Sequence, residues 1–144
     1  MMNIARMDTD TVEVAAALAQ KLWPDAETLG EEFAGALSDP EFAVFLAYED
    51  GMPMGFAQCQ LRRDYVEGCS TSPVGYLEGI YVEDMYRGRG AARALLAQCE
   101  AWAKALGCAE FASDCELTNT QSIAFHKSVG FSEENRIVCF KKEL

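Results

Sequence analysis

The sequence predicts an α/β domain in which a mixed sheet carries helices on its faces. Two observations support this class. Apolar segments with strand spacing alternate with segments of helical spacing along all 144 residues. Half of the residues are hydrophobic and 24% are charged, which is ordinary for a globular protein with a packed core. No repeat, low-complexity tract or linker interrupts the chain, so residues 1–144 are expected to form a single domain.

The chain is expected to open with a strand and a helix. A short strand is predicted near Ile4. The apolar residues that follow keep helical spacing, and either Asp8 or Asp10 can cap that helix at its start. The helix is expected to end at Trp23-Pro24, because proline cannot continue it.

A second helix is predicted from Thr28. Glu31 stands three residues later, which is the spacing of a capping box. Leu29, Phe33 and Leu37 recur on one side and are expected to face the core.

Three strands are predicted next. Glu41–Glu49 and Gly55–Tyr65 flank Asp50-Gly51, the strongest short hairpin signal in the chain. Val74–Val82 is a further apolar strand, and Gly79 inside it predicts a bulge or a close backbone approach.

The last third of the chain predicts two helices that alternate with two strands. The helices are Gly90–Leu106 and Asn119–Val129, and each is followed by a glycine that stops it. The strands are Cys108–Asp114 and Arg136–Lys142. The complete predicted order is β-α-α-β-β-β-α-β-α-β.

Charge and composition exclude several classes of function. The net charge of −11 argues against nucleic acid as a partner and favours cationic ligands. No metal is expected, since the chain has one histidine and no Cys-x-x-Cys. No apolar stretch could span a membrane and no secretory signal is visible, so a cytoplasmic location is expected. Free thiols are therefore predicted for Cys59, Cys69, Cys99, Cys108, Cys115 and Cys139.

The segment Arg87–Ala92 is a glycine-containing turn between a predicted strand and a predicted helix. The first turn of a helix exposes unpaired N–H groups, and small residues let an anion approach them. A bare glycine pattern favours a plain turn with solvated arginines, but two arginines beside two glycines in an acidic chain make an anion site more credible than a plain turn. The segment matches neither a Walker loop nor Gly-x-Gly-x-x-Gly, which argues against nucleotide hydrolysis and dinucleotide binding.

Two motifs in this half resemble the GNAT superfamily. Arg87, Gly90 and Ala92 match its signature Arg/Gln-x-x-Gly-x-Gly/Ala, and Asn119 followed by a helix ending in Gly130-Phe131 matches a second signature. The resemblance implies a mostly antiparallel central sheet that is splayed between its fourth and fifth strands and flanked by about four helices. It also implies acetyl-CoA as co-substrate.

The same resemblance implies which residues hold acetyl-CoA. The pantetheine arm would lie on the main chain of Ile80, Tyr81 and Val82, and Asn119 would contact it. The pyrophosphate would lie on the turn and the helix start, at Arg87, Gly88, Arg89, Gly90, Ala91, Ala92 and Arg93.

A narrower resemblance covers most of the chain. The blocks Leu22–Pro24, Arg63–Gly68, Leu77–Ile80 and Phe111–Asp114 look like the aminoglycoside 6′-N-acetyltransferases. The implied reaction is acetyl transfer from acetyl-CoA to the 6′-amine of an antibiotic sugar. Rival functions are acetylation of another amine, a polyamine or a protein N-terminus, and a non-catalytic acyl-CoA sensor.

A polycationic acceptor requires carboxylates near the thioester. Glu78 and Asp114 are expected to bind it and to help remove its ammonium proton. Trp23 and Tyr65 would supply a wall and a hydroxyl for a sugar ring, as the resemblance implies. Asn135 stands where the relatives tend to have a substrate-binding carboxylate, so one cationic contact is expected to be weaker unless Glu133 or Glu134 replaces it.

Direct transfer is the expected mechanism. Strand N–H groups near Tyr81 can stabilise the oxyanion, and the leaving thiolate needs little proton help. His126 occupies the position at which many GNAT enzymes place a tyrosine as general acid, so it is the candidate acid. The relatives commonly dimerise through C-terminal strands, and the apolar segment Ile137–Phe140 would suit a homodimer.

Overall fold

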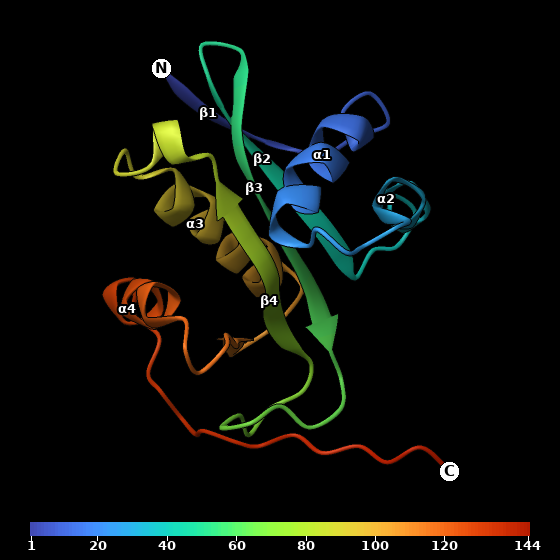
Figure 1. Ribbon diagram of the computed structural model, residues 1–144, viewed down its shortest axis with the longest axis vertical. Helices are drawn as coiled ribbons and strands as arrows, with labels where there is room; N and C mark the ends of the chain where they lie inside the picture. The colour runs from blue at the N-terminus through green and yellow to red at the C-terminus, as the bar shows by residue number, and fades with distance from the viewer.

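The computed structural model describes residues 1–144 and contains a five-stranded sheet in the order β1-β2-β3-β4-β5 (Figure 1). The first four strands pair antiparallel, and β4 and β5 pair parallel. The mixed, mostly antiparallel sheet predicted from the sequence is therefore confirmed. The strands are β1 (Met2–Arg6), β2 (Phe42–Glu49), β3 (Met52–Arg62), β4 (Val74–Val82) and β5 (Phe111–Ser113).

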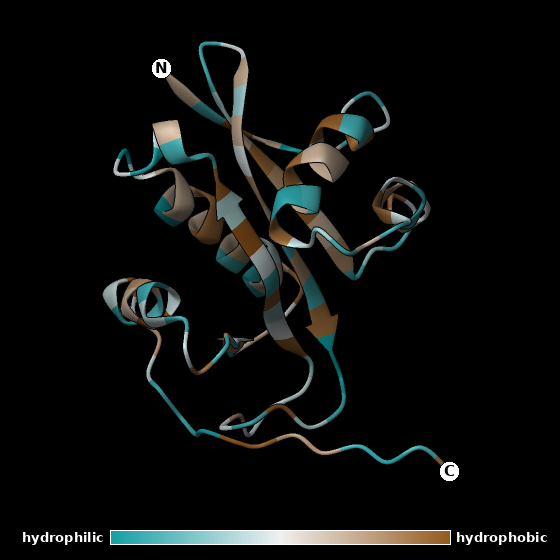
Figure 2. Cartoon of the chain, in the orientation of Figure 1, coloured by the Kyte–Doolittle hydropathy of each residue, from teal (hydrophilic) through white to brown (hydrophobic).

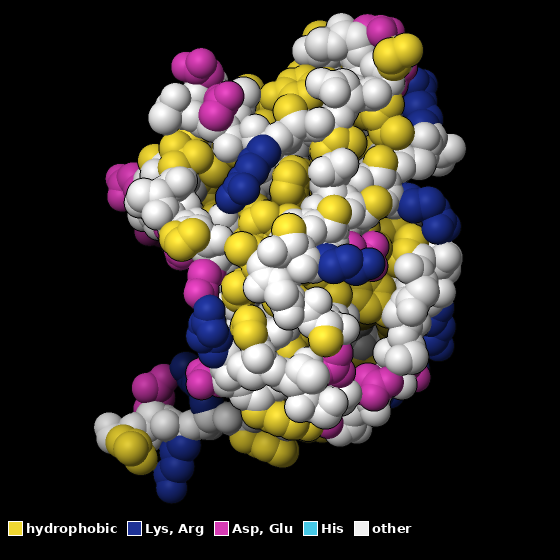
Figure 3. All heavy atoms as spheres, turned by 180° about the vertical axis from the view of Figure 1, so that it is seen from behind, with side chains coloured by type: hydrophobic (Ala, Val, Ile, Leu, Met, Phe, Trp, Pro, Cys, Tyr) yellow, Lys and Arg dark blue, Asp and Glu magenta, His cyan; other side chains and the backbone are white.

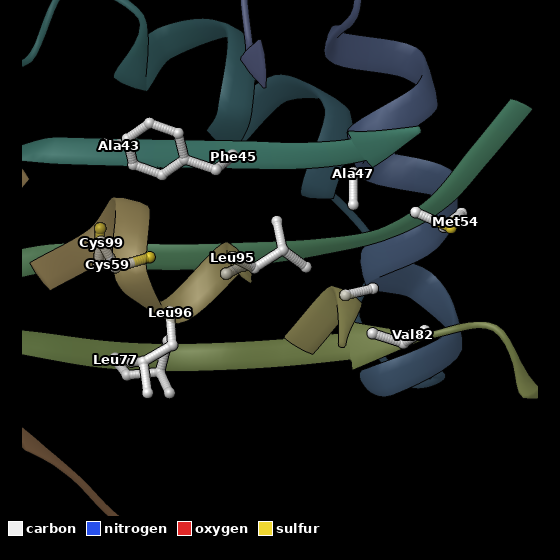
Figure 4. Close-up of a cluster of buried hydrophobic side chains, with 12 residues drawn as sticks. Ala43, Phe45, Ala47, Met54, Cys59, Leu77, Val82, Leu95, Leu96 and Cys99 are labelled. Carbon is white, nitrogen blue, oxygen red and sulfur yellow. The ribbon is translucent and has the colours of Figure 1, made fainter. Parts of the chain in front are cut away.

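Helices cover both faces of this sheet. One buried cluster joins α1 (Val12–Leu22) and α2 (Leu29–Ala36) to β2 and β3. A second joins α3 (Ala91–Ala105) to the opposite face, where its Leu95, Leu96 and Cys99 lie on the strands (Figure 4). The strand alternation divides neighbours between the two clusters, since Val44 belongs to the first and Phe45 to the second.

The remaining elements are a 3-10 turn, η1 (Asp84–Tyr86), and the helix α4 (Thr120–Ser128). None of the helices combines the length and apolar character that crossing a membrane demands.

The predicted hairpin is confirmed at Asp50-Gly51. Both residues adopt left-handed backbone conformations, with φ of 47° and 85°. Two consecutive positive φ angles match the twist of the flanking strands β2 and β3.

The bulge predicted around Gly79 is also confirmed. Gln58 of β3 faces Gly79 and Cys59 faces Leu77, so Glu78 is the extra residue on β4. A Cβ on Gly79 would stand 2.5 Å from the ring of Trp23, which explains why glycine is needed there. The bulge therefore turns Glu78 and the Gly79 backbone toward the end of α1.

The splay between β4 and β5 starts directly beside this bulge. The two strands share three residue pairs, of which Leu77↔Ser113 is the last. From Glu78 to Val82 the outer edge of β4 has no strand partner. The splay that the family resemblance implied is present at the expected place.

The predicted cap of the first helix is wrong. Thr11 is the residue before α1, whereas Asp8 lies further upstream. The Asp8 carboxylate instead accepts a hydrogen bond of 2.9 Å from the amide of Asp10, which forms a turn that precedes the helix.

The second helix begins after Thr28 as predicted, but without a capping box. The Thr28 hydroxyl donates to the carboxylate of Glu32 at 3.2 Å and makes no bond to the helix amides. Glu31 takes no part. Leu29 and Phe33 are buried, but Leu37 follows the end of α2 and is exposed.

Two strands differ in extent from their predictions. The predicted strand Gly55–Tyr65 begins earlier, directly after the hairpin turn, and ends at Arg62. The predicted strand Cys108–Asp114 is reduced to Phe111–Ser113, because the pairing with β4 stops at the splay.

The prediction of a last strand at Arg136–Lys142 is wrong, because these residues form no strand within the chain. No backbone group from residue 132 onward makes a hydrogen bond to the rest of the chain, and a strand requires such a partner. The segment runs in an extended path away from the body (Figure 1), and its end stands clear of the surface (Figure 3). Its apolar stretch leaves Ile137 66% and Phe140 91% exposed (Figure 2).

All six cysteines are free thiols, as predicted. Cys59 and Cys99 are buried side by side between β3 and α3 (Figure 4), whereas Cys115 and Cys139 are exposed. The hydrogen bond with Cys59 and the burial both raise the pKa of the Cys99 thiol.

Candidate active site

The turn before α3 presents a row of free backbone amides. Gly88 and Gly90 have φ angles of 80° and 85°, and nothing lies within 4 Å of where their Cβ atoms would be. No amide from Gly88 to Arg93 donates a hydrogen bond within the chain. Successive free amides at a helix N-terminus form an anion-binding concavity. The predicted amides therefore have no partner within the chain, and the space over Gly88 and Gly90 is open, although Ala91 as a residue is buried.

Each of the three arginines in and after this turn contacts a different part of the chain. Arg87 donates from Nε to the carbonyl of Val82 at 2.9 Å and forms an ion pair with Asp84, so it fastens the turn to the end of β4. Arg89 lies 5.5 Å from the ring of Tyr86. Arg93 reaches the Ser128 carbonyl of α4 at 3.4 Å. Arg87 is therefore engaged within the chain, whereas the amides remain free to bind an anion.

The free edge of β4 leads from this turn to the bulge. The side chains of Ile80 and Val82 pack toward α3, and that of Tyr81 packs against the α1 side. Only their main chain faces the splay. Asn119 accepts a hydrogen bond of 3.1 Å from the amide of Ser122 and caps α4, which leaves its NH₂ group free to donate. An open turn followed by a free strand edge fits a pyrophosphate with an extended arm.

A cleft of about 500 Å³ opens on the α1/α2 face of the sheet. Trp23 forms one wall. Its ring packs edge-on against the ring of Phe56, with the two ring centroids 5.8 Å apart. Glu32 and Glu78 place carboxylates in the lining. The complete lining is Trp23, Ala26, Leu29, Glu32, Phe33, Phe42, Gln58 and Glu78.

The predicted site lacked Glu32 and Gln58. Glu32 precedes the buried Phe33 in α2 and reads in sequence as an ordinary solvent-facing helix residue. Gln58 stands in an apolar strand with no motif around it. Gln58 reaches the cleft through the pairing of β3 with β4, where it faces Gly79, and Glu32 reaches it through the packing of α2 on α1 and on Phe42 of β2, so no local signal could have found them.

Glu78 is held by a cation of the same chain. Arg62, the last residue of β3, donates from Nε at 3.0 Å and from a terminal nitrogen at 2.8 Å to its two carboxylate oxygens. This bidentate pair raises the pKa of the Arg62 guanidinium. Sixteen residues separate the two partners, so Arg62 carries no local signal in the sequence.

Asp114 is engaged as well. The hydroxyl of the buried Tyr76 donates to its carboxylate. Burial, and then the hydrogen bond to Asp114, raise the pKa of Tyr76, so its hydroxyl stays protonated. The Arg62 guanidinium lies 3.5 Å from the centre of the Tyr76 ring. Glu78, Arg62, Tyr76 and Asp114 therefore form one continuous network.

The apex of the splay is the point at which β4 and β5 separate. His126 reaches it through the side chain of Ser113. Its Nδ1 lies 2.7 Å from the Ser122 carbonyl, which can only accept, so Nδ1 carries a proton. Nε2 lies 2.8 Å from the hydroxyl of Ser113, whose residue forms the last pair with Leu77. In the neutral imidazole the Ser113 hydroxyl donates to Nε2. His126 thus reaches the splay only through Ser113, a residue that the predicted site lacked.

Asp114 joins the network with Glu78 but does not line the cleft, and two further predicted substrate residues also lie outside the lining. Tyr65 follows the end of β3 and is 77% exposed. Asn135 belongs to the C-terminal segment, where its amide donates to Glu67 at 2.7 Å. Neither lies in the network of Glu78 and Asp114.

Known proteins match the chain in sequence and in structure. Residues 10–131 match the acetyltransferase (GNAT) family. The aminoglycoside N(6′)-acetyltransferase type 1 of Stenotrophomonas maltophilia is 48% identical over 134 residues, which cover 90% of this chain and 88% of that protein. The enzyme of the same name from Serratia marcescens is 41% identical, with 95% and 96% covered.

Two solved structures match the chain over its whole length. AAC(6′)-Iy, in complex with the bisubstrate analog CoA-S-monomethyl-acetylneamine, superposes with a TM-score of 0.96 at 36% identity and covers 100% of this chain and 99% of its own. AAC(6′)-Ih from Acinetobacter baumannii gives a TM-score of 0.94 at 39% identity, with 100% and 99% covered.

Proposed function

The chain belongs to the GNAT family of acetyltransferases, and on that premise we propose that it moves acetyl from acetyl-CoA to the 6′-amine of aminoglycoside antibiotics by direct transfer. Such a reaction inactivates the antibiotic and confers resistance. The relatives that carry this activity in their names match along nearly the whole chain, so the proposal covers both the donor side and the acceptor side.

The row of free amides from Gly88 to Arg93 carries the proposal. These groups bind the pyrophosphate of acetyl-CoA, and the main chain of Ile80, Tyr81 and Val82 holds the pantetheine arm along the free edge of β4. The free NH₂ group of Asn119 contacts that arm. Acetyl-CoA supplies the acetyl thioester, and no metal is needed to activate it.

The cleft on the other face of the sheet receives the aminoglycoside. Glu32 and Glu78 attract its ammonium groups, with Asp114 at the far end of the network, and Trp23 forms a wall for a sugar ring. The net charge of −11 favours this small polycation over nucleic acid or an anionic membrane surface. We place the reaction in the cytoplasm, because acetyl-CoA is an intracellular metabolite.

Two residues handle protons on opposite sides of the sheet. Glu78 orients the acceptor ammonium in the cleft and accepts its proton. His126, in its protonated form, donates from Nε2 to Ser113, whose hydroxyl then protonates the departing sulfur at the apex of the splay. Asp114 keeps Tyr76, and through it Arg62, in place beside Glu78.

The proposal predicts a strict requirement for a 6′-amine. Neomycin and paromomycin differ at the 6′ carbon, which carries an amine in the first and a hydroxyl in the second. With acetyl-CoA, neomycin should release CoA thiol and gain one acetyl group at that amine, as read by mass spectrometry and NMR, whereas paromomycin should not be acetylated at that position.

Other outcomes of this assay contradict the proposal. Turnover of polyamines or peptide N-termini without turnover of neomycin would indicate a GNAT enzyme for other amines. Binding of acetyl-CoA without acetylation of any amine would indicate a sensor.

We propose further that the chain works as a homodimer in which residues 132–144 pair with a second copy. This segment offers exposed apolar side chains and backbone groups that make no backbone–backbone hydrogen bond. The sheet ends in β5, a three-residue edge strand with room for a neighbour. An extended segment without a strand partner, in a chain whose sheet ends in such an edge, is the arrangement from which strand exchange arises.

Light scattering tests the dimer. The wild-type chain should have the mass of two copies. A Val138→Glu and Phe140→Glu double variant should have the mass of one copy, because its new carboxylates would lie in the apolar contact between the two copies. Lys142→Gln, in the same segment but outside its apolar stretch, should leave the dimer intact. A wild-type chain that remains one copy at all concentrations would contradict the proposal.

A further inference from the structure

The side chain of Gln20 ties the loop after α1 to the end of that helix. Gln20 stands in the last turn of α1, and its Nε2 lies 3.0 Å from the carbonyl oxygen of Trp23, 3.1 Å from that of Pro24 and 2.8 Å from that of Ala26. An amide nitrogen carries two hydrogens, so two N–H groups serve three acceptors. One side chain therefore holds the carbonyls of three loop residues.

Few other polar contacts hold this loop. The Trp23 amide donates to the Ala19 carbonyl at 2.9 Å, and the Ala26 amide donates to the Trp23 carbonyl at 3.1 Å. Pro24 has no N–H to donate. Beyond the Trp23 amide, no backbone hydrogen bond joins the loop to α1, so Gln20 supplies the remaining polar link to the helix.

The loop carries part of the proposed acceptor cleft. Trp23 and Ala26, at its two ends, both line the cleft, whereas Gln20 lies outside the lining. The six-membered part of the Trp23 ring lies so close to Gly79 that a Cβ there would stand 2.5 Å from it. Gly79 follows Glu78 in the bulge of β4, so the loop sets the position of the aromatic wall relative to that carboxylate.

The hydrogen bonds of Gln20 stand at the surface of the molecule. All three have exposed surroundings, and water can bond to the same carbonyls when the side chain is absent. Their loss should therefore cost little stability. It would let the loop and the Trp23 ring adopt several positions, and a bound sugar would then have to order them.

We propose that Gln20 is a positioning residue, which holds the Trp23 ring beside Glu78 before the acceptor binds. The inference rests on the proposed acetylation of aminoglycosides, in which Trp23 forms a wall of the acceptor site. It adds to that site a residue that lies outside the cleft and acts through another side chain.

The variant Gln20→Met tests this role, because methionine keeps an unbranched side chain and a high helix propensity but cannot donate. The KM for neomycin should rise about tenfold, which corresponds to the loss of roughly one hydrogen bond. Both kcat and the KM for acetyl-CoA should stay at the wild-type values, since the wall supports the acceptor equally in the ground state and the transition state. Gln98→Met removes the same side chain from an exposed position of α3 and should change none of these constants.

A double variant distinguishes the positioning of Trp23 from a general effect on α1. Trp23→Leu removes the ring and should itself raise the KM for neomycin. In that background Gln20→Met should add little, because no ring remains to be held, whereas an independent effect would add in full.

Fluorescence reports the position of the ring without turnover. The chain has two tryptophans, so Trp102→Phe leaves Trp23 as the only one. In that background Gln20→Met should raise the constant for quenching of Trp23 by acrylamide, because a loosened loop exposes the ring more often. Neomycin should lower the constant with either residue at position 20.

The outcomes differ from those that test the proposed function. A wild-type chain that does not acetylate neomycin contradicts the function itself. If neomycin is acetylated but Gln20→Met leaves either its KM or the quenching of Trp23 unchanged, Gln20 has no positioning role. A loss of affinity for both substrates, an equal effect of Gln98→Met or full additivity with Trp23→Leu would overturn the inference as well.

Discussion

Glu78→Gln should lower kcat/KM for neomycin by about a hundredfold, the low end of the range for loss of a positioned proton acceptor. The amide keeps the size of the side chain but cannot accept the ammonium proton. It also leaves the guanidinium of Arg62 without its partner at 3.0 and 2.8 Å, so a positive charge faces the cationic acceptor. Both consequences act on the acceptor, and neither touches the free amides that are proposed to bind the donor.

Steady-state kinetics with each substrate varied in turn checks this result. The dissociation constant for acetyl-CoA should equal that of the wild-type chain. Glu41→Gln is the matched control, because Glu41 also holds an arginine through two hydrogen bonds but lies outside the cleft lining. A Glu78→Gln variant that loses affinity for both substrates would indicate misfolding, and one with full activity would remove Glu78 from the mechanism.

Gly90→Val should raise the KM for acetyl-CoA by about a hundredfold, which corresponds to the loss of two charge-assisted hydrogen bonds of about 1.5 kcal/mol each. Gly90 has a φ of 85°, and the space above it is empty of protein atoms. A branched side chain would fill the space where the pyrophosphate approaches. It would also strain the left-handed backbone by about 1–2 kcal/mol.

Gly107→Val separates the two effects. Gly107 follows the other end of α3, has a φ of 92° and likewise has nothing within 4 Å of its Cβ position. This variant should suffer similar strain and a similar fall in Tm, but its KM for acetyl-CoA should stay at the wild-type value. If the two variants shift KM equally, or if neither does, the pyrophosphate lies elsewhere.

Features set by neighbours in the sequence were predictable. Asp50-Gly51 predicted the hairpin because both turn positions need left-handed backbones that these residue types tolerate. Gly90 predicted the start of α3 for the same local reason. The family motifs added the splay beside β4, which no local pattern could predict.

Features that depend on distant pairing were not predictable. The contact between Arg62 and Glu78 depends on the register of β3 and β4 and on the one-residue bulge, which a charge pattern does not encode. Glu32 enters the cleft only through the packing of α2. The apolar stretch near Ile137 predicted a strand, but an apolar pattern does not specify which chain supplies the partner.

The distribution of the cysteines bears on how turnover should be followed. A disulfide reagent that detects the released CoA thiol will also react with the exposed Cys115 and Cys139. Cys59 and Cys99 will not react while the chain is folded. Burial keeps both thiols from the reagent, and the raised pKa of Cys99 opposes formation of its thiolate. The background colour therefore comes first from the exposed Cys115 and Cys139 and more slowly from the partly exposed Cys69 and Cys108, so only a rise above four groups per chain reports that the space between β3 and α3 has opened.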